Sequence, residues 1–304
     1  MKYRKNKSNM ENVVINKKYS KSFWCAKVLH RLPLITGVSS FYNKKRHKII
    51  NDKLLPIMDC AVRISPKIDK KVNSKNIWIF WWQGKDRMPS LVKKCYQSVI
   101  RNKGRRHVIL ITKDNIKQYA TIPNYIYEKV NNGEITLTHL SDILRFNLLN
   151  EYGGLWIDST IYLTDSLDAF NTEKIVTCGG YPKDRFFNIS YGRWTGFFIG
   201  GPQGSELFNF MDNFFRIYWK YNDKLIDYFL IDYALNYAWN NNLDGFKFLN
   251  KNINPDLFKL QGILNEKYDS DLFKKITKNT RAFKLSYKKK INTNNRQSFY
   301  CNLK

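Results

Sequence analysis

Short apolar runs alternate with helix-forming segments from residue 77 to about residue 200, and this alternation restricts the possible folds most. The run 77–82 (IWIFWW) is continuously apolar, which is typical of a strand buried on both faces of a sheet. Further strands are predicted at 107–112, 155–163, 175–180 and 195–200, and helices from Ser90, near Asp114, and over 125–130, 140–152, 205–220 and 224–239. Strands that alternate with helices favour an α/β fold with a mostly parallel sheet and covering helices.

Basic residues are concentrated toward the ends of the chain. The 304 residues hold 52 Lys and Arg against 25 Asp and Glu, a net charge of +27, and residues 1–75 carry +15 whereas residues 76–180 carry only +3. Hydrophobic residues make up 43% of the chain, which is enough apolar surface to exclude a disordered protein. We expect a basic helical N-terminal extension over 1–75, a Lys- and Asn-rich linker over 66–76, and an α/β domain over 76–304.

The predicted N-terminal extension also carries large apolar residues at helical spacing. Trp24, Val28 and Leu29 fall on one face of a helix. A basic amphipathic helix is typical of a segment that lies on an anionic membrane surface. Two alternatives remain open. The helix could pack on the main domain with its lysines in water, or the basic surface could bind nucleic acid, although no zinc-finger or RNA-binding motif is visible.

The five cysteines are odd in number and widely spaced, which favours reduced thiols in a cytoplasmic protein. They are Cys25, Cys60, Cys95, Cys178 and Cys301. The longest apolar candidate, 23–41, is interrupted by charged residues and a proline, so it falls short of the ~20 apolar residues of a membrane-spanning helix. We therefore expect a cytoplasmic protein that associates peripherally with the inner face of the cell membrane.

The segment 138–160 (THLSDILRFNLLNEYGGLWIDST) combines charged side chains with a predicted helix and a predicted strand. Asp142 and Arg145 are three residues apart and therefore share one face near the start of the helix. Asp158 follows the apolar run LWI, at the carboxyl end of the strand, where open α/β sheets bind ligands. The segment thus predicts a polar site at one edge of the sheet.

These residue types suit a phosphorylated ligand. An arginine offers a planar fork of donors to phosphate, and the N-terminus of a helix adds free N–H groups. A carboxylate such as that of Asp158 can hold Mg²⁺ or Mn²⁺, and the cation would bridge phosphate oxygens. A second interpretation stays open from spacing alone, in which Asp142 and Arg145 form a structural ion pair and Asp158 is a turn residue.

The string SDILR, followed after seven residues by GGLWID, resembles the signature of the DXD-containing sugar transferases of glycosyltransferase family 32. The likeness is strongest to their capsular polysaccharide synthesis branch. It covers about 77–239 and is absent from 1–70. The resemblance implies a Rossmann-like GT-A fold that binds a nucleotide sugar, a divalent cation, and transfer with retention of the anomeric configuration.

By position, the resemblance also implies roles for individual residues. Asp142 would hydrogen-bond the donor sugar, Arg145 would bind the diphosphate or the sugar, and Asp158 would lie near the metal and the ribose. Trp81, in the string WWQG with Gln83, matches an aromatic that stacks on the nucleotide base, for which a flat apolar face is needed. Core packing is the open alternative for Trp81.

The sequence departs from the DXD pattern at its third position, which is Thr160 rather than an acid. Since a hydroxyl is a weaker ligand than a carboxylate for a hard cation, either Asp158 holds the cation together with the diphosphate and water, or another acid contributes. Asp232 is our candidate, because a carboxylate inside an aromatic-rich helix should have a partner. The alternative for Asp232 is a capped or salt-bridged helix residue.

The sequence therefore predicts a hexosyltransferase-type glycosyltransferase that moves a sugar from a nucleotide sugar to a growing surface or capsular polysaccharide. We expect a lipid-linked acceptor at the inner membrane face. A metal-dependent phosphohydrolase or nucleotidyltransferase is one alternative, although it would require more clustered acids than 76–180 supplies. A basic nucleic-acid-binding protein is the other.

Overall fold

The computed structural model describes residues 36–65, 71–180, 186–248, 250–252 and 254–304, together with Met10, Trp24 and Val28. The helices are α3 (Thr36–Ile64), α4 (Ser90–Asn102), α5 (Ile116–Tyr119), α6 (Asn124–Asn131), α7 (Leu137–Tyr152), α8 (Glu206–Tyr221), α9 (Leu230–Asn240), α10 (Lys259–Ile263), α11 (Ser270–Thr277) and α12 (Phe299–Asn302). The strands are β1 (Asn76–Phe80), β2 (His107–Ile111), β3 (Gly154–Ile157), β4 (Ile161–Leu163), β5 (Val176–Cys178), β6 (Phe198–Gly201), β7 (Asn250–Asn252) and β8 (Ala282–Lys284).

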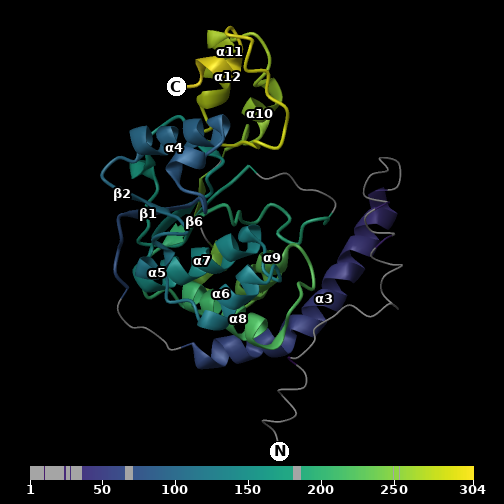
Figure 1. Cartoon of the computed structure of the whole chain (residues 1–304). Coiled ribbons are helices and arrows are strands. Elements are labelled where there is room, and N and C mark those ends of the chain that lie inside the picture. Colours follow the sequence, from purple (N-terminus) through teal and green to yellow (C-terminus); the bar gives the residue numbers. More distant parts are fainter. Residues whose placement is uncertain are drawn as a thin grey trace, which may run out of the picture.

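A sheet in the order β2-β1-β3-β6-β5-β7 forms the centre of the described structure (Figure 1). β1 pairs in parallel with β2 and β3, and β5 pairs in parallel with β7, whereas β6 runs antiparallel to both of its neighbours. The predicted α/β class is confirmed, and antiparallel β6 makes the sheet mixed. β4 and β8 form a separate antiparallel pair.

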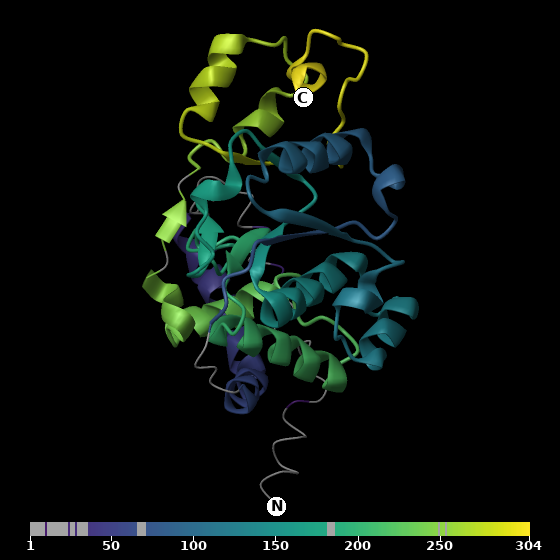
Figure 2. The same cartoon turned by 90° about the vertical axis from the view of Figure 1, so that its left-hand side faces the viewer.

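The two faces of β1 pack into different parts of the core. Ile77 and Ile79 belong to a buried cluster with Val99 of α4, whereas Trp78 and Phe80 belong to the cluster that includes α7 and α8. Side chains alternate across a strand, so an apolar run such as IWIF is buried on both faces only when helices cover both sides. Figure 2 shows this arrangement, with α4 (blue) above the sheet and α7 and α8 (teal and green) below it.

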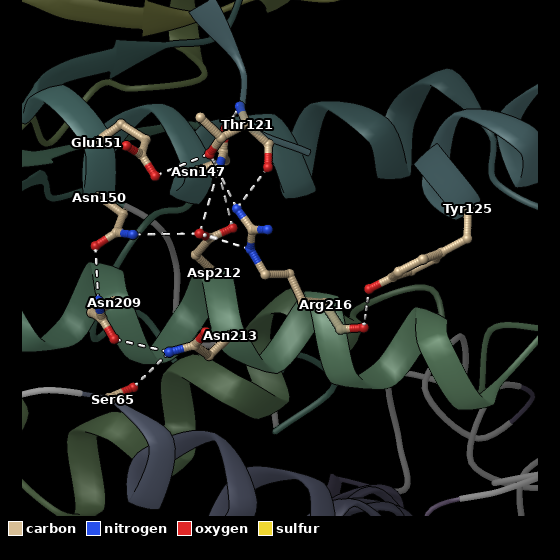
Figure 3. Close-up of polar contacts among 10 residues, drawn as sticks. All are labelled: Ser65, Thr121, Tyr125, Asn147, Asn150, Glu151, Asn209, Asp212, Asn213 and Arg216. Atoms are coloured by element: carbon tan, nitrogen blue, oxygen red, sulfur yellow. Dashed lines mark hydrogen bonds and ion pairs between the residues drawn. The ribbon is translucent and has the colours of Figure 1, made fainter. Parts of the chain in front are cut away.

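A polar network lies between α7 and α8 and fixes their contact (Figure 3). Buried Asp212 of α8 accepts hydrogen bonds from Asn147 Nδ2 of α7, at 3.3 Å from both carboxylate oxygens, and from Arg216 Nε at 3.0 Å. Burial raises the pKa of Asp212, and the guanidinium of Arg216 opposes that rise. Buried polar groups with complete partners specify one packing arrangement, and this network therefore holds α7 in a defined position against α8.

The helix α3 packs across α8 and α9 and belongs to the main core (Figure 1). Its residues Ile50, Leu54, Ile57 and Met58 are buried in the same cluster as α7 and α8. Residues 36–64, within the range predicted as an extension, therefore form a helix that packs on the main core. Leu29, Cys25 and 66–70 of the predicted linker lie outside the described residues, while Trp24 is 66% exposed.

We expect Leu54→Ala to lower the free energy of unfolding by about 2–5 kcal/mol, because the side chain is fully buried and its removal leaves a cavity. The adjacent Leu55 is 45% exposed and provides a matched control, for which Leu55→Ala should cost less than about 1 kcal/mol. Urea unfolding of both variants measures the difference. Equal stabilities would show that α3 is not part of the cooperative core.

Several predicted boundaries are wrong in informative ways. The strand predicted over 155–163 is two strands, β3 and β4, because the chain turns at Asp158, whose carbonyl accepts a hydrogen bond from Ile161 N at 3.0 Å. The helix predicted from 224 begins at Leu230, after Asp227 Oδ1 accepts a hydrogen bond from Phe229 N.

The four described cysteines are free, in agreement with the prediction of reduced thiols.

Candidate functional site

The helix α7 begins earlier than predicted and places Asp142 and Arg145 in its interior. Thr136 is the N-cap, and its side chain accepts a hydrogen bond from His139 N, so the helix begins at Leu137 rather than at the predicted residue 140. Asp142 therefore lies in the second turn. Both Asp142 and Arg145 are buried, at 8% and 3% exposure. Charged groups at this depth require partners.

Arg145 joins Asp142 to Asp158. Its Nη1 lies 2.7 Å from Asp142 Oδ1, and its Nη2 lies 3.2 Å from Asp158 Oδ1. The guanidinium also lies 5.0 Å from the ring centroid of Trp156 in β3. The three side chains predicted as the centre of the site therefore form one contiguous cluster.

Two glycines position Asp158 relative to α7. Gly153 and Gly154 have φ angles of 64° and 99°, a region that other residues rarely adopt. A Cβ atom on Gly154 would lie 2.4 Å from the carbonyl oxygen of Asn76, so only glycine allows β3 to approach β1 here. The close β1–β3 pairing fixes the end of β3, and Asp158 follows it directly.

Lys284 is the third side chain that binds the carboxylate of Asp158, and the sequence analysis did not predict it. Lys284 Nζ lies 2.7 Å from Asp158 Oδ2 and 2.9 Å from Thr160 Oγ1, while Trp156 Nε1 donates to Asp158 Oδ1 at 2.9 Å. Burial alone would raise the pKa of the Asp158 carboxyl, but the charges of Lys284 and Arg145 outweigh it and hold that pKa below its ordinary value. Asp158 is therefore ionised at neutral pH.

Asp232 lines the same cavity as the cluster, a hollow of about 330 Å³ that also borders Asp142, Arg145 and Asp158. Trp194 Nε1 donates a hydrogen bond to Asp232 Oδ1 at 2.8 Å. Burial raises the pKa of Asp232 to about 6, although the hydrogen bond from Trp194 opposes the rise. The structure thus brings Asp232 to the site, as predicted, without direct contact to Asp158.

The raised pKa of Asp232 predicts a pH-dependent stability. Because this carboxyl binds its proton more tightly in the folded chain, the folded protein loses stability as the pH rises from the ordinary pKa of 3.8 through about 6. We expect Asp232→Asn to match the wild type at pH 4 and to be more stable by about 2–3 kcal/mol at pH 7. Urea unfolding across this range measures the difference, and a difference that does not change with pH would contradict the assignment.

A larger cavity of about 610 Å³ adjoins the first, because both have Ser141, Asp158, Tyr228 and Lys284 in their walls. Predicted residues Trp81 and Gln83 line this larger cavity, together with Leu137 and Thr138 from the first turn of α7 and with Tyr287, Lys288 and Lys289. Trp81 is half-buried, and its ring meets that of Tyr287 edge to face, with centroids 5.7 Å apart. The larger cavity therefore combines aromatic faces, amide groups and positive charge.

His139 and Tyr228 also border the cluster, and no expectation was placed on either. His139 Nδ1 lies 3.6 Å from Asp142 Oδ2, and the rings of His139 and Tyr228 meet edge to face at 5.8 Å. Tyr228 is exposed and lines both cavities. His139 stands in the string THLSD, three residues before Asp142, and this spacing is the sequence feature that could have placed it beside Asp142.

The side chains around Asp158 do not fit a divalent cation as they are arranged. Within the described ranges, no group of three or more His, Cys, Asp or Glu residues is placed to hold a metal ion. Both carboxylate oxygens of Asp158 accept hydrogen bonds from cationic side chains, and the hydroxyl of Thr160 is bound to Lys284. The predicted Mn²⁺ or Mg²⁺ site stays a prediction that this geometry does not favour.

Comparison with protein families relates almost the whole chain to one of them. The model of the family described as "Capsular polysaccharide synthesis protein" matches residues 34–303. The match begins two residues before α3 and ends in the last described residues, so it is longer at both ends than the range 77–239 over which the sequence showed a resemblance. No solved structure matches the chain significantly.

Curated relatives are more distant. Glycosyltransferase afumC from Aspergillus fumigatus is 23% identical over 160 residues, which is 48% of this chain and 41% of the relative. O-glycosyltransferase braB from Annulohypoxylon truncatum is 27% identical over 112 residues, 34% of this chain and 27% of the relative. O-glycosyltransferase PaGT from Phomopsis amygdali is 27% identical over 114 residues, 34% and 28% of the two chains. The chain thus spans less than half the length of these relatives.

Proposed function

The chain belongs to the capsular polysaccharide synthesis protein family, and on this basis we propose that it is a glycosyltransferase that uses a nucleotide-sugar donor. The observation that carries the proposal is the cluster of Asp142, Arg145 and Asp158, which lines the smaller cavity and reaches the adjoining larger cavity at Asp158. The names of the curated relatives, all glycosyltransferases, support the same reaction class.

The two cavities suit the two ends of such a donor. The larger one, beside Trp81 and Gln83, suits the nucleoside, because bases stack on aromatic faces and bond to amides. The smaller one, beside Asp142 and Asp232, suits a sugar, whose hydroxyls donate to carboxylates. The diphosphate would then lie at the junction, next to Arg145 and Lys284.

In the proposed reaction, the bond between the anomeric carbon and the phosphate oxygen breaks, and its electron pair leaves with the nucleoside diphosphate. The acceptor hydroxyl forms the new bond on the same face, which retains the anomeric configuration, and its proton passes to the leaving diphosphate. The protein's contribution is electrostatic, since positive groups fixed at the junction stabilise the charge that develops there. From the resemblance to family 32, we also propose that the fold is of the GT-A type and that the enzyme is a hexosyltransferase.

We further propose that the acceptor is a lipid-linked, growing surface glycan reached at the inner face of the membrane. Within the described residues, no helix has the length and apolar character to cross a bilayer. One face of α3 nevertheless presents Val38 and Phe41, 46% and 63% exposed, beside the exposed Lys45 and Lys48. Apolar and basic side chains on one helix face suit an anionic leaflet.

Sedimentation with anionic vesicles tests this membrane contact. The double variant Phe41→Ser/Lys45→Glu should bind the vesicles several-fold less than the wild type, because it removes both the apolar and the charge contribution. Lys274→Glu on α11 is the matched control, since its side chain is 79% exposed and lies on another element. Equal loss in the control would mean that only net charge matters, and no loss in either variant would refute the contact.

Thermal unfolding in the presence of a panel of nucleotide sugars tests the proposed donor. A ligand that binds only the folded state raises the melting temperature in a concentration-dependent way. We expect one or a few nucleotide sugars to stabilise the wild type and to release the nucleoside diphosphate when a suitable acceptor is added. A panel in which none stabilises the protein, with or without Mn²⁺, would remove the proposal. Binding of nucleic acid that weakens with salt would instead favour the basic nucleic-acid-binding alternative.

A further inference from the structure

Lys284 occupies the position in which the family resemblance implies a metal ion. Its ammonium lies between Asp158 Oδ2 at 2.7 Å and Thr160 Oγ1 at 2.9 Å. These oxygens belong to the first and third residues of the string D-S-T, which replaces the cation-binding D-X-D of the resemblance. The carboxylate that D-X-D carries at its third position is therefore absent from the sequence, and the ammonium of Lys284 lies between the two side chains that would hold the cation.

The backbone of β8 fixes Lys284 in this position. β8 pairs with β4, with Lys284 opposite Ile161, and the next residue, Leu285, donates its N–H to the carbonyl of Thr160 at 2.9 Å. Lys284 N donates to the carbonyl of Leu257 at 2.8 Å. The ammonium also lies 4.8 Å from the ring centroid of Phe197, within range of a cation–π contact. Lys284 is thus positioned by main-chain bonds on either side of its own Cα.

The same ammonium remains open to a ligand. The Lys284 side chain is 22% exposed and lines both the larger and the smaller cavity. A lysine ammonium has three N–H donors, and Asp158 and Thr160 accept from two of them. Lys284 is therefore available to an anion bound where the two cavities meet.

The charges lining the two cavities favour an anion over a second cation. Four basic side chains (Arg145, Lys284, Lys288 and Lys289) stand against three acidic ones (Asp142, Asp158 and Asp232). A divalent ion at the free edge of Asp158 would lie within a few ångströms of two positive groups already bound to that carboxylate. Like charges at such distances repel one another more strongly in a partly buried site than in water, because the effective dielectric constant is lower there.

We propose that Lys284 is the resident cation of the donor site and that its ammonium, with Arg145, binds the diphosphate without a metal ion. The inference rests on the proposed function and concerns how that site neutralises its ligand. As the glycosidic bond to phosphate breaks, negative charge grows on the leaving diphosphate. Lys284 acts as a point charge, whereas Arg145 offers directed donors.

Calorimetric binding of nucleoside diphosphates to the wild-type chain tests this inference without any mutation. UDP, GDP, ADP and CDP are titrated in EDTA and again with Mn²⁺. We expect the diphosphate that binds to do so with affinities within about threefold in the two buffers. Binding that is more than tenfold tighter with Mn²⁺ would overturn the role of Lys284 and leave the proposed function standing. Binding of none of them in either buffer would overturn the proposed function, and the inference with it.

Two variants of Lys284 test the charge itself in the same EDTA buffer. Lys284→Met keeps the length of the side chain and should weaken the diphosphate by about 10- to 100-fold, the usual effect of losing a charged hydrogen bond, while the corresponding nucleoside binds nearly as before. Lys284→Arg keeps the charge and should retain most of the affinity, which also covers the case of a Met variant that does not fold. Lys274→Met on α11 is the matched control. A diphosphate affinity unchanged in Lys284→Met would refute the inference.

Discussion

Replacing Asp158 with asparagine is expected to lower the rate of sugar transfer by at least about 100-fold, the usual cost of losing a key electrostatic group in an active site. The carboxylate holds three donors at once, since Oδ1 accepts from Trp156 and Arg145 and Oδ2 accepts from Lys284. An asparagine has one oxygen and one NH₂ group, so its NH₂ would face a donor wherever it points. Both cationic side chains would then lose their fixed orientation toward the diphosphate.

The experiment uses the donor found by thermal stabilisation and measures nucleoside diphosphate release. Asp271→Asn provides the matched control, because the Asp271 side chain is 90% exposed on α11. Circular dichroism and a melting curve establish that Asp158→Asn is folded. Full activity in a folded Asp158→Asn variant would remove the catalytic role, whatever the geometry of the cluster.

Stability against pH gives an independent readout of Asp158. The pKa of this carboxyl is lowered in the folded chain, so its ionised form contributes stability above the ordinary value of 3.8, and that contribution is lost as pH falls through the folded pKa. The wild type should therefore lose stability more steeply than Asp158→Asn when the solution is acidified below pH 4. Parallel curves would mean that Lys284 and Arg145 do not interact with Asp158 in solution.

The centre of the site could be predicted because its parts are encoded locally. Asp142, Arg145 and Asp158 lie within 17 residues on one helix, one turn and one strand. The spacing of Asp142 and Arg145 fixes their common face, and Gly153 and Gly154 return the chain beside β1. Once the helix and the strand are assigned, the three side chains can hardly avoid one another.

Lys284 could not be predicted because its place depends on a long-range pairing. The ion pair with Asp158 joins residues 126 positions apart, and it exists because β8 pairs with β4. The three-residue strand AFK has no pattern that distinguishes it from other short apolar segments. A lysine in a chain with 52 basic residues also attracts no attention by composition.

The position of α3 could not be predicted for a related reason. Apolar residues such as Ile50, Leu54 and Ile57 among lysines fit a membrane surface and a protein core equally well, because both bury one face of a helix. The choice depends on whether a partner surface exists elsewhere in the fold. Here the aromatic-rich helices α8 and α9 supply it, and only residues such as Phe41 remain on the outer face.

Replacing Arg145 with alanine is expected to have the second large effect, and it should weaken both stability and ligand binding. Arg145 is 3% exposed and its guanidinium lies between two carboxylates, so its removal leaves Asp142 and Asp158 buried without their shared counter-ion. Breaking a buried ion pair by removing one partner costs about 3–5 kcal/mol. Arg105→Ala is the matched control, since the Arg105 side chain is 84% exposed.

The pH dependence separates this electrostatic cause from a simple loss of packing. Without Arg145, protonation of one carboxylate relieves the repulsion between the buried carboxylates of Asp142 and Asp158. The difference in stability between Arg145→Ala and the wild type should therefore narrow as the pH falls from 7 to 5. A cavity left by the missing side chain would give a gap that does not change with pH.

Arg145→Lys should recover part of the stability but less of the diphosphate affinity, because an ammonium cannot span Asp142 and Asp158 with two directed donors. Urea unfolding at both pH values, with calorimetric titration of the diphosphate at pH 7, measures each effect. A stable Arg145→Ala variant with unaltered diphosphate affinity would show that the cluster is neither a structural ion pair nor part of the donor site.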